Sequence, residues 1–170
     1  MNWFLFTYFV NFFLYLLTHE GYRGLDRRRI FGWNRFAELA DLKRDNFYFE
    51  WEKEINQRVV KLQLKTTKEI LGLMSLEVFS KESFVKIRLL AVSEVNRGRN
   101  KKFDRIAGHL ITYAAQLAVY NFAEDACLVI WPKTIVAEHY KEKYKMKQVG
   151  SLLSLEVPEI IDVINKYDHD

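Results

Sequence analysis

The sequence predicts a mixed α/β (α+β) domain in which a mostly antiparallel sheet is flanked by helices. Three observations lead to this prediction. Three apolar segments with strand-like patterns follow one another between residues 60 and 93, separated by short polar turns. A long segment with helical spacing of apolar residues comes next, and shorter apolar runs then alternate with helical segments. At 170 residues and 49% hydrophobic residues, the chain is long enough for one domain with its own core.

The composition excludes several other classes of protein. Two prolines and seven glycines exclude collagen-like and low-complexity chains. The single cysteine, Cys127, excludes a disulfide framework and a cysteine-rich zinc site, and it fits a reducing cytoplasmic setting. The formal net charge of +4 is lower than that of a dedicated nucleic-acid-binding protein, so we do not expect nucleic acid as a partner.

Residues 1–19 form a hydrophobic segment that we expect to be helical. Its apolar run, residues 3–17, is shorter than the roughly 20 residues that a helix needs to cross a bilayer. It also lacks the positive start and the small-residue cleavage site of a secretory signal. One interpretation is an anchor that contacts a membrane. The other is a helix docked on the domain, or an extension upstream of the true start codon. We give the two interpretations equal weight. The expected location is cytoplasmic, with membrane contact through this segment if it acts as an anchor.

The next part, residues 20–45, is rich in arginine and is punctuated by glycine. We predict a basic connector with one short helix over residues 33–42. Residues 46–170 are then expected to form the folded domain.

Three strands are predicted at the start of this domain. Apolar and polar residues alternate over residues 60–64, which indicates a half-buried strand. A second strand covers Ile70–Phe79, where Gly72 marks a bulge or a close approach of other atoms to the backbone. A third covers residues 84–93 and ends in a stretch that is apolar on both faces, as in a central strand. We expect these strands to form an antiparallel meander.

A helix is predicted over residues 106–118, and Asp104 has a side chain suited to cap it. A short buried strand, residues 127–131, follows, and Pro132 ends it. The remaining elements are a helix over 134–145, a strand over 152–157 and a last helix over 158–167, with Pro158 in its first turn. The long helix is expected to connect two parallel strands.

This order of elements resembles the GNAT superfamily of acyl-CoA-dependent N-acyltransferases over roughly residues 46–157. The likeness includes the strand that ends at Val92, the basic loop after it, and the helical segment around Tyr140. It implies the GNAT-like mixed sheet and an enzyme that transfers an acyl group, most simply acetyl from acetyl-CoA, to an amine by direct attack. The amine acceptor and the oligomeric state cannot be read from the sequence.

In that family, the loop before the central helix has the pattern Gln/Arg-x-x-Gly-x-Gly/Ala, and its backbone holds the pyrophosphate of coenzyme A. Residues 102–107 align with this pattern, but Arg105 stands where the family has a glycine. A register shifted to residues 105–110 restores the glycine at Gly108. The resemblance implies cofactor contacts from the strand end, the loop and the first helical turn: Val92, Arg97, Lys101, Lys102, Arg105, Ile106, Ala107 and Gly108.

Two residues are candidates for the chemistry. The resemblance implies that Tyr140 is the general acid for the leaving thiolate and that Glu94 is a base for the amine. The alternatives are that Tyr140 only packs in the core and that Glu94 pairs with a nearby arginine. Lys133 stands where many family members have asparagine, which motivates a second hypothesis, a non-catalytic GNAT-fold binding or regulatory module. No metal site is predicted, because the histidines are isolated.

Overall fold

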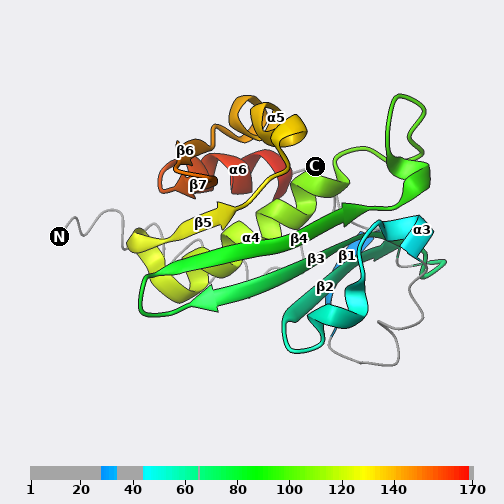
Figure 1. Ribbon diagram of the computed structural model, residues 1–170, viewed down its shortest axis with the longest axis horizontal. Helices are drawn as coiled ribbons and strands as arrows, with labels where there is room; N and C mark the ends of the chain where they lie inside the picture. The colour runs from blue at the N-terminus through cyan, green and yellow to red at the C-terminus, as the bar shows by residue number, and fades with distance from the viewer. Residues whose placement is uncertain (1–27, 34–43, 65, 169–170) are drawn as a thin grey trace.

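The computed structural model describes residues 28–33, 44–64 and 66–168. These ranges form one sheet flanked by helices, so the predicted fold class is confirmed (Figure 1). The predicted hydrophobic segment 1–19 lies outside the described residues. So does the predicted helix 33–42, apart from residue 33. The strands are β1 (Arg28–Trp33), β2 (Arg58–Leu64), β3 (Ile70–Phe79), β4 (Phe84–Val92), β5 (Cys127–Ile130), β6 (Lys147–Val149) and β7 (Leu152–Glu156).

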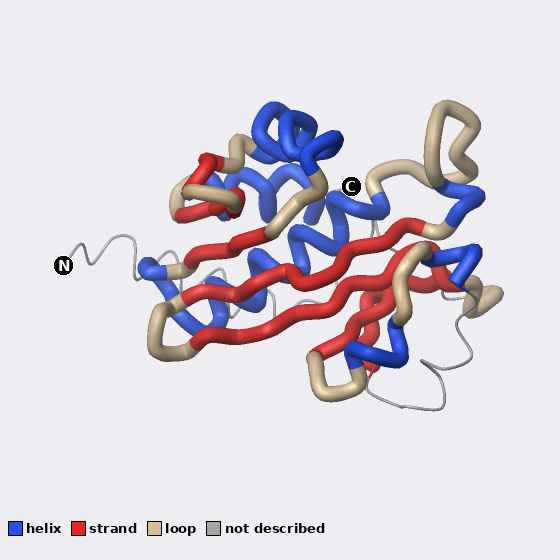
Figure 2. The backbone as a smooth tube through the Cα atoms, viewed as in Figure 1, coloured by secondary structure: helices blue, strands red, loops and turns tan. Residues whose placement is uncertain are grey.

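The seven strands lie in the order β1-β2-β3-β4-β5-β7-β6. Among the strands of the described ranges, β4 and β5 alone pair in parallel, and every other neighbouring pair is antiparallel. Helix α4 (Ile106–Phe122) makes the connection between the two parallel strands, as the sequence predicted (Figure 2). The N-terminal meander is therefore joined to the C-terminal part of the sheet by one parallel pairing.

The sheet begins earlier than the sequence indicated. Strand β1 lies within the segment that was expected to be a connector, and it pairs with β2 along its whole length. Its sequence begins with two arginines and contains a glycine rather than a strict alternation, so the pattern gave no strand signal. The strand lies at one edge of the sheet, where charged residues are tolerated because one side of the backbone has no partner strand.

One face of the sheet carries the main core. Helices α4 and α6 (Glu159–Asp168) contact each other and pack on this face. Gly72 of β3 lets α4 approach, because a Cβ atom there would lie 2.8 Å from the Ile106 side chain and 3.0 Å from the Leu110 side chain. The expected close approach at this glycine is confirmed, and a break in the β2–β3 register lies beside it.

The opposite face carries a second, smaller core. The short helix α3 (Arg44–Phe47) and the 3₁₀ helix η1 (Trp51–Glu54) come before β2. Phe47 and Trp51 pack there against Leu73 of β3 and Ala91 of β4, and all four side chains are buried. The segment from residue 44 to residue 54 is thereby fixed on the face of the sheet that α4 does not cover.

Two local predictions differ from the structure, and one further strand was missed. Asp104 does not cap α4: the N-cap residue is Arg105, and the Asp104 carboxylate pairs with Lys101 instead. Pro158 precedes α6, and its carbonyl oxygen accepts hydrogen bonds from the N–H groups of Ile161 and Asp162. The short strand β6 was not predicted, because its three residues are all exposed and show no apolar pattern.

Candidate functional site

The sheet opens between β4 and β5. These strands pair only from Phe84 to Ile87 on β4 and from Cys127 to Ile130 on β5. Beyond Ile87, β4 continues for five more residues to Val92, whereas β5 ends and the chain turns away toward α5 (Thr134–Tyr144) (Figures 1 and 2). No strand of the described chain pairs with residues 88–92 on that side, so this edge of the β4 backbone can pair with a ligand.

A β-bulge lies where the opening begins. Ser75 pairs with Leu89 and Leu76 pairs with Ile87, which leaves Arg88 as the extra residue of β4. A bulge bends its strand and increases the local twist, so it directs β4 away from its neighbour. Arg88 therefore lies immediately after the last residue that β4 pairs with β5.

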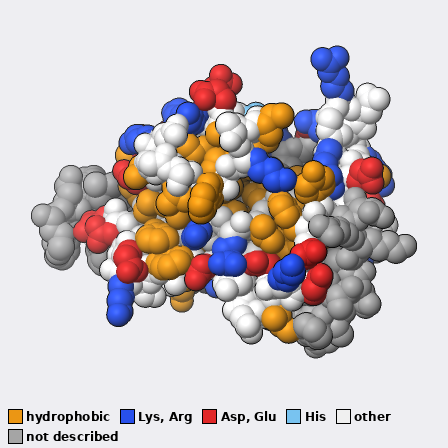
Figure 3. Space-filling view, viewed as in Figure 1, with side chains coloured by type: hydrophobic (Ala, Val, Ile, Leu, Met, Phe, Trp, Pro, Cys, Tyr) orange, Lys and Arg blue, Asp and Glu red, His pale blue; other side chains and the backbone are white. Residues whose placement is uncertain are grey.

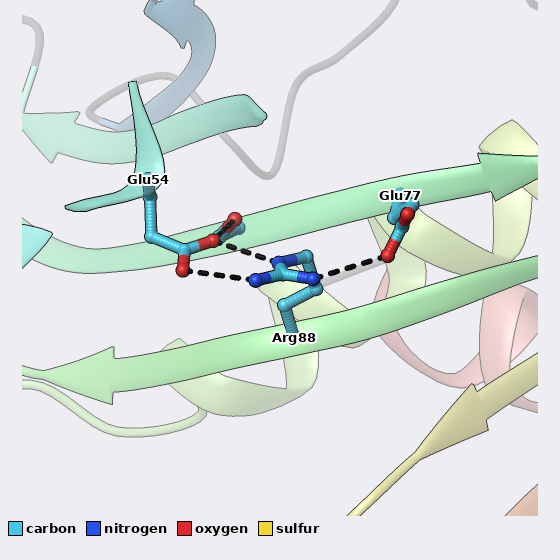
Figure 4. Close-up of polar contacts among 4 residues, drawn as sticks. Glu54, Glu77 and Arg88 are labelled. Carbon is cyan, nitrogen blue, oxygen red and sulfur yellow. Dashed lines mark hydrogen bonds and ion pairs between the residues drawn. The ribbon is translucent and has the colours of Figure 1, made fainter. Parts of the chain in front are cut away.

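The bulge is held by a polar cluster that we call the Arg88 clamp, made of Arg88, Glu54, Glu77 and Ser75 (Figure 4). Arg88 donates from Nε and Nη2 to the two carboxylate oxygens of Glu54, at 2.9 and 3.3 Å, and from Nη1 to Glu77 at 3.1 Å. The buried Ser75 hydroxyl donates to Glu54 as well. The clamp thus ties the bulge of β4 to β3 and to η1.

The buried carboxylate of this clamp stays ionised. Burial of Glu54 favours its neutral form, but the hydrogen bonds from Arg88 and Ser75 and the charge of Arg88 outweigh that effect. The pKa of Glu54 is consequently below its ordinary value of 4.5.

The basic loop after β4 is anchored at its base by one buried side chain. Asn96 is 5% exposed; it donates to the Ser93 hydroxyl and accepts from the Phe103 N–H, both at 2.8 Å. The Lys102 N–H also donates to the Val95 carbonyl. These bonds close the loop, so residues 97–101 project from the fold while residue 103 returns to the start of α4. Figure 3 looks onto the face that α4 does not cover and shows basic side chains at the top right, where this loop lies.

The first turn of α4 has free backbone donors. Arg105 precedes it in a left-handed conformation with φ of 61°, and no side chain caps the helix. The first helical bond runs from the His109 N–H to the Arg105 carbonyl. The N–H groups of Ile106, Ala107 and Gly108 have no partner in the described part of the chain. An uncapped helix start with unpaired donors attracts anions.

Cations of the basic loop and of α6 lie close enough to Lys143 of α5 to affect its charge, and one of them, Arg105, directly precedes α4. The pKa of Lys143 on α5 is below its ordinary value because of burial and because of the positive charges of Lys101, Lys166 and Arg105. The charge of Asp104 offsets this only in part. Two of these cations, Lys143 and Lys166, were not among the predicted site residues. Their helices come later in the chain, and only the fold brings them beside the loop.

The other residues predicted to contact the cofactor lie in different surroundings. Lys102 is exposed and pairs with Glu69 at 3.3 Å. The side chain of Ile106 is buried in the core, so only its backbone can face a ligand. Gly108 faces α6, because a Cβ atom there would lie 2.3 Å from the ring of Tyr167. Val92 ends β4, and its carbonyl accepts from Arg97 at 2.8 Å.

The two catalytic candidates lie on different elements. Tyr140 is on α5, partly buried against the core, and burial raises the pKa of its hydroxyl. That hydroxyl has no hydrogen-bond partner among the described residues. Glu94 is exposed in η2 (Glu94–Asn96), and neither Arg97 nor Arg99 pairs with its carboxylate. No hydrogen bond or ion pair between described residues joins Tyr140 to Glu94.

Two further features bear on the chemistry. Cys127 lies half-buried in β5, and burial raises the pKa of its thiol, which disfavours the nucleophilic thiolate. Over the ranges that the structure describes, no group of three or more histidine, cysteine, aspartate or glutamate side chains could hold a metal ion. No helix in those ranges is both long and apolar enough to cross a bilayer.

Comparison of the fold with solved structures gives matches to acetyltransferases. An apo structure titled FdhC, a nucleotide-linked sugar GNAT, has a TM-score of 0.56 at 10% identity and covers 85% of this chain and 94% of its own. A mutant of the SpeG spermidine N-acetyltransferase from Vibrio cholerae has a TM-score of 0.54 at 9% identity, covering 79% and 96%. A GNAT family acetyltransferase from Elizabethkingia anophelis with acetyl-CoA bound has a TM-score of 0.51 at 15% identity, covering 78% and 99%.

No family model matches the sequence, and neither does any curated protein. At such low identity, the structural likeness shows the fold alone. The chain has the GNAT fold, as the sequence resemblance implied.

Proposed function

We propose that this GNAT-fold chain is an acyl-CoA-dependent N-acyltransferase, with acetyl-CoA as the acyl donor. One observation carries the proposal: the free edge of β4 and the uncapped, cation-surrounded start of α4 follow one another along the chain. The first suits an extended chain with amide groups, and the second suits a pyrophosphate. Acyl-CoA contains both.

The phosphates would bind at the helix start. The N–H groups of residues 106–108 provide three unpaired donors, and the helix dipole adds partial positive charge. Arg105, Lys101 and Lys143 supply full charges nearby. Like charges that crowd one another are relieved when an anion binds among them, so this cluster favours a phosphate over water.

The thioester would lie in the opening beside β4. Residues 88–91 offer backbone groups to the two amides of the pantetheine arm, in the manner of an added strand, while the Val92 carbonyl accepts from Arg97. The Arg88 clamp holds the bulge at the place where the two strands separate, and we expect it to set the width of the opening.

The reaction needs no covalent enzyme intermediate. The acceptor nitrogen forms a bond to the thioester carbon, the carbon–sulfur bond breaks, and the electron pair leaves with the sulfur. Glu94 would take the proton from the amine, directly or through water, and Tyr140 would return a proton to the thiolate. Burial raises the pKa of Tyr140, so its hydroxyl holds the proton that it would give to the thiolate, although the same shift makes it a weaker acid.

The competing candidate is a GNAT-fold module that binds acyl-CoA without transferring its acyl group. Arg105 favours it, because the residue stands where the family pattern has glycine. Its φ of 61° is a conformation that glycine adopts without strain. A side chain at this position narrows the approach to the helix start.

Turnover distinguishes the two candidates. Acetyl-CoA is incubated with the full chain and a mixture of amines of several classes, and release of free thiol is followed. We expect turnover, and we expect Tyr140→Phe to lower kcat by about 100-fold or more without weakening coenzyme A binding. Tyr120→Phe is the control, because Tyr120 is an exposed tyrosine on α4. Coenzyme A binding without turnover would favour the module, and an unchanged kcat would remove Tyr140 from the mechanism.

A further inference from the structure

A second cluster lies at the opening between β4 and β5. It is formed by two cations around one exposed aromatic ring. The Nζ atom of Lys133 lies 4.5 Å from the centre of the Tyr48 ring and 5.7 Å from that of Phe49. The guanidinium of Arg97 lies 5.8 Å from the centre of the same Tyr48 ring. We call these four residues the Tyr48 cluster. Arg97 was predicted to contact the cofactor, whereas Tyr48, Phe49 and Lys133 have no part in the proposed acyl-CoA site.

The Tyr48 cluster spans the opening between β4 and β5. Arg97 follows β4 and is fixed by bonds to the carbonyls of Val92, at 2.8 Å, and Asn46, at 2.6 Å. Lys133 follows β5 and directly precedes α5. Because Tyr48 contacts both cations, its ring bridges the segments that leave the two diverging strands.

The backbone of Tyr48 has an unusual conformation. Its φ is 72°, a left-handed conformation that costs a tyrosine energy, and its side chain is 60% exposed. Neighbouring Phe47 and Trp51 are buried in the second core and fix the backbone on either side. An exposed ring kept in a strained conformation by a rigid surrounding is a feature of ligand-binding segments.

The cations of this cluster lack acidic partners. Arg97 donates to two backbone carbonyls, and the ammonium group of Lys133 lies over two aromatic rings; neither forms an ion pair with a described residue. Other cations of the fold differ, since Arg88, Lys101 and Lys102 each pair with a carboxylate. Two positive charges without counter-charges beside a reaction site favour an anionic ligand group.

Exposed apolar surface accompanies the charges. Trp131, two residues before Lys133, is 66% exposed, and Ile135, two residues after it, is 89% exposed. Large apolar side chains with such exposure are suited to contact an apolar part of a ligand.

We propose that the acceptor is an amine that also carries a carboxylate and an aromatic or large apolar group. Its carboxylate would bind Lys133 and Arg97, and its apolar group would lie against Tyr48. An amino acid with an aromatic side chain is the simplest member of this class. The inference rests on the proposed function, since it identifies the acceptor of that reaction.

A matched set of acceptors tests the inference in the full chain. Phenylalanine, phenylalaninamide and phenethylamine share the ring but differ in the carboxylate, which the second replaces by a neutral amide and the third lacks. We expect kcat/KM to be at least about tenfold higher for phenylalanine. Lys133→Met should raise KM for phenylalanine by about tenfold while it leaves KM for phenethylamine and for acetyl-CoA unchanged. Lys141→Met is the control, because Lys141 lies on α5, which Lys133 directly precedes.

A binding measurement keeps the inference testable if turnover is slow. N-acetylphenylalanine and N-acetylphenethylamine are titrated into the chain in the presence of coenzyme A. We expect the first to bind more tightly and Lys133→Met to abolish the difference. Equal binding, or binding of neither product while coenzyme A binds, would overturn the inference but not the proposed function. Failure of coenzyme A itself to bind would instead overturn the proposed function.

Discussion

Removal of the Arg88 guanidinium tests how the opening between β4 and β5 is maintained. In Arg88→Met the aliphatic part of the side chain is kept, but three hydrogen bonds to Glu54 and Glu77 are lost. The Glu54 carboxylate would then remain buried with only the Ser75 hydroxyl as a donor. An ionised carboxylate with one neutral partner is costly in a folded protein.

The size of the effect follows from the exposure of the two partners. Loss of one partner of a fully buried ion pair costs about 3–5 kcal/mol. The Glu54 side chain is 8% exposed, but that of Arg88 is 34% exposed, so solvent screens part of the interaction. We therefore expect Arg88→Met to lower the free energy of unfolding by about 2–3 kcal/mol. Glu77→Gln removes only the more exposed partner and should cost less than about 1 kcal/mol.

Urea unfolding of a double-mutant cycle measures this coupling. The cycle compares Arg88→Met, Glu54→Met and the double variant, and we expect a coupling of about 2 kcal/mol between the two sites. If the clamp fixes the width of the opening, Arg88→Met should also raise KM for acetyl-CoA. A change below about 0.5 kcal/mol in stability, within the range of ordinary surface substitutions, would refute the reasoning.

The dependence of stability on pH provides a second test of the Arg88 clamp. The pKa of Glu54 is below 4.5 in the folded chain, so the unfolded chain binds the proton more readily. The stabilisation from this carboxylate is thus fully present above about pH 4.5 and is lost as the pH falls through the lower, folded value. Glu54→Gln should remove this part of the pH dependence. A curve of the same slope in wild type and variant would contradict it.

Three further substitutions test the supports of the site, each by urea unfolding. Gly72→Ala would place a methyl against α4 and should cost about 1–3 kcal/mol; a neutral result would show that α4 does not pack so closely. Gly108→Ala gains helix propensity of about 1 kcal/mol, yet the clash with Tyr167 should leave it net destabilised, and a stabilised variant would disprove that contact. Asn96→Ala leaves the Phe103 N–H unpaired and should cost about 1–3 kcal/mol while making the basic loop more sensitive to proteolysis.

Helices and strands with a strong apolar periodicity could be predicted from the sequence. The second strand was predicted with the bounds that β3 has, and the alternation at 60–64 identified most of β2. The switch from period two to helical spacing located α4, and with it the parallel pairing of β4 and β5. Edge strands β1 and β6 were missed, because exposed strands have little apolar pattern to detect.

Less of the candidate site could be predicted from the sequence, because its residues come from segments that are far apart in the chain. The basic loop and the start of α4 are consecutive in sequence, so their residues were found together. Lys143 and Lys166 come from later helices and join them only in the fold. The clamp between Glu54 and Arg88 joins residues 34 positions apart, and the bulge that places Arg88 depends on strand register. Register follows from pairing in three dimensions, and a single sequence does not display it.

Calorimetric titration of acetyl-CoA and coenzyme A into the full chain tests the central claim most directly. The full chain is needed because β1 precedes the predicted domain start at residue 46. We predict one-to-one binding that weakens about fivefold or more in Lys143→Gln and is unaffected by Lys141→Gln, whose exposed pairing with Glu138 contributes little. Absence of binding by folded protein, or equal affinity in the two variants, would contradict the assignment of the α4 start as an acyl-CoA site.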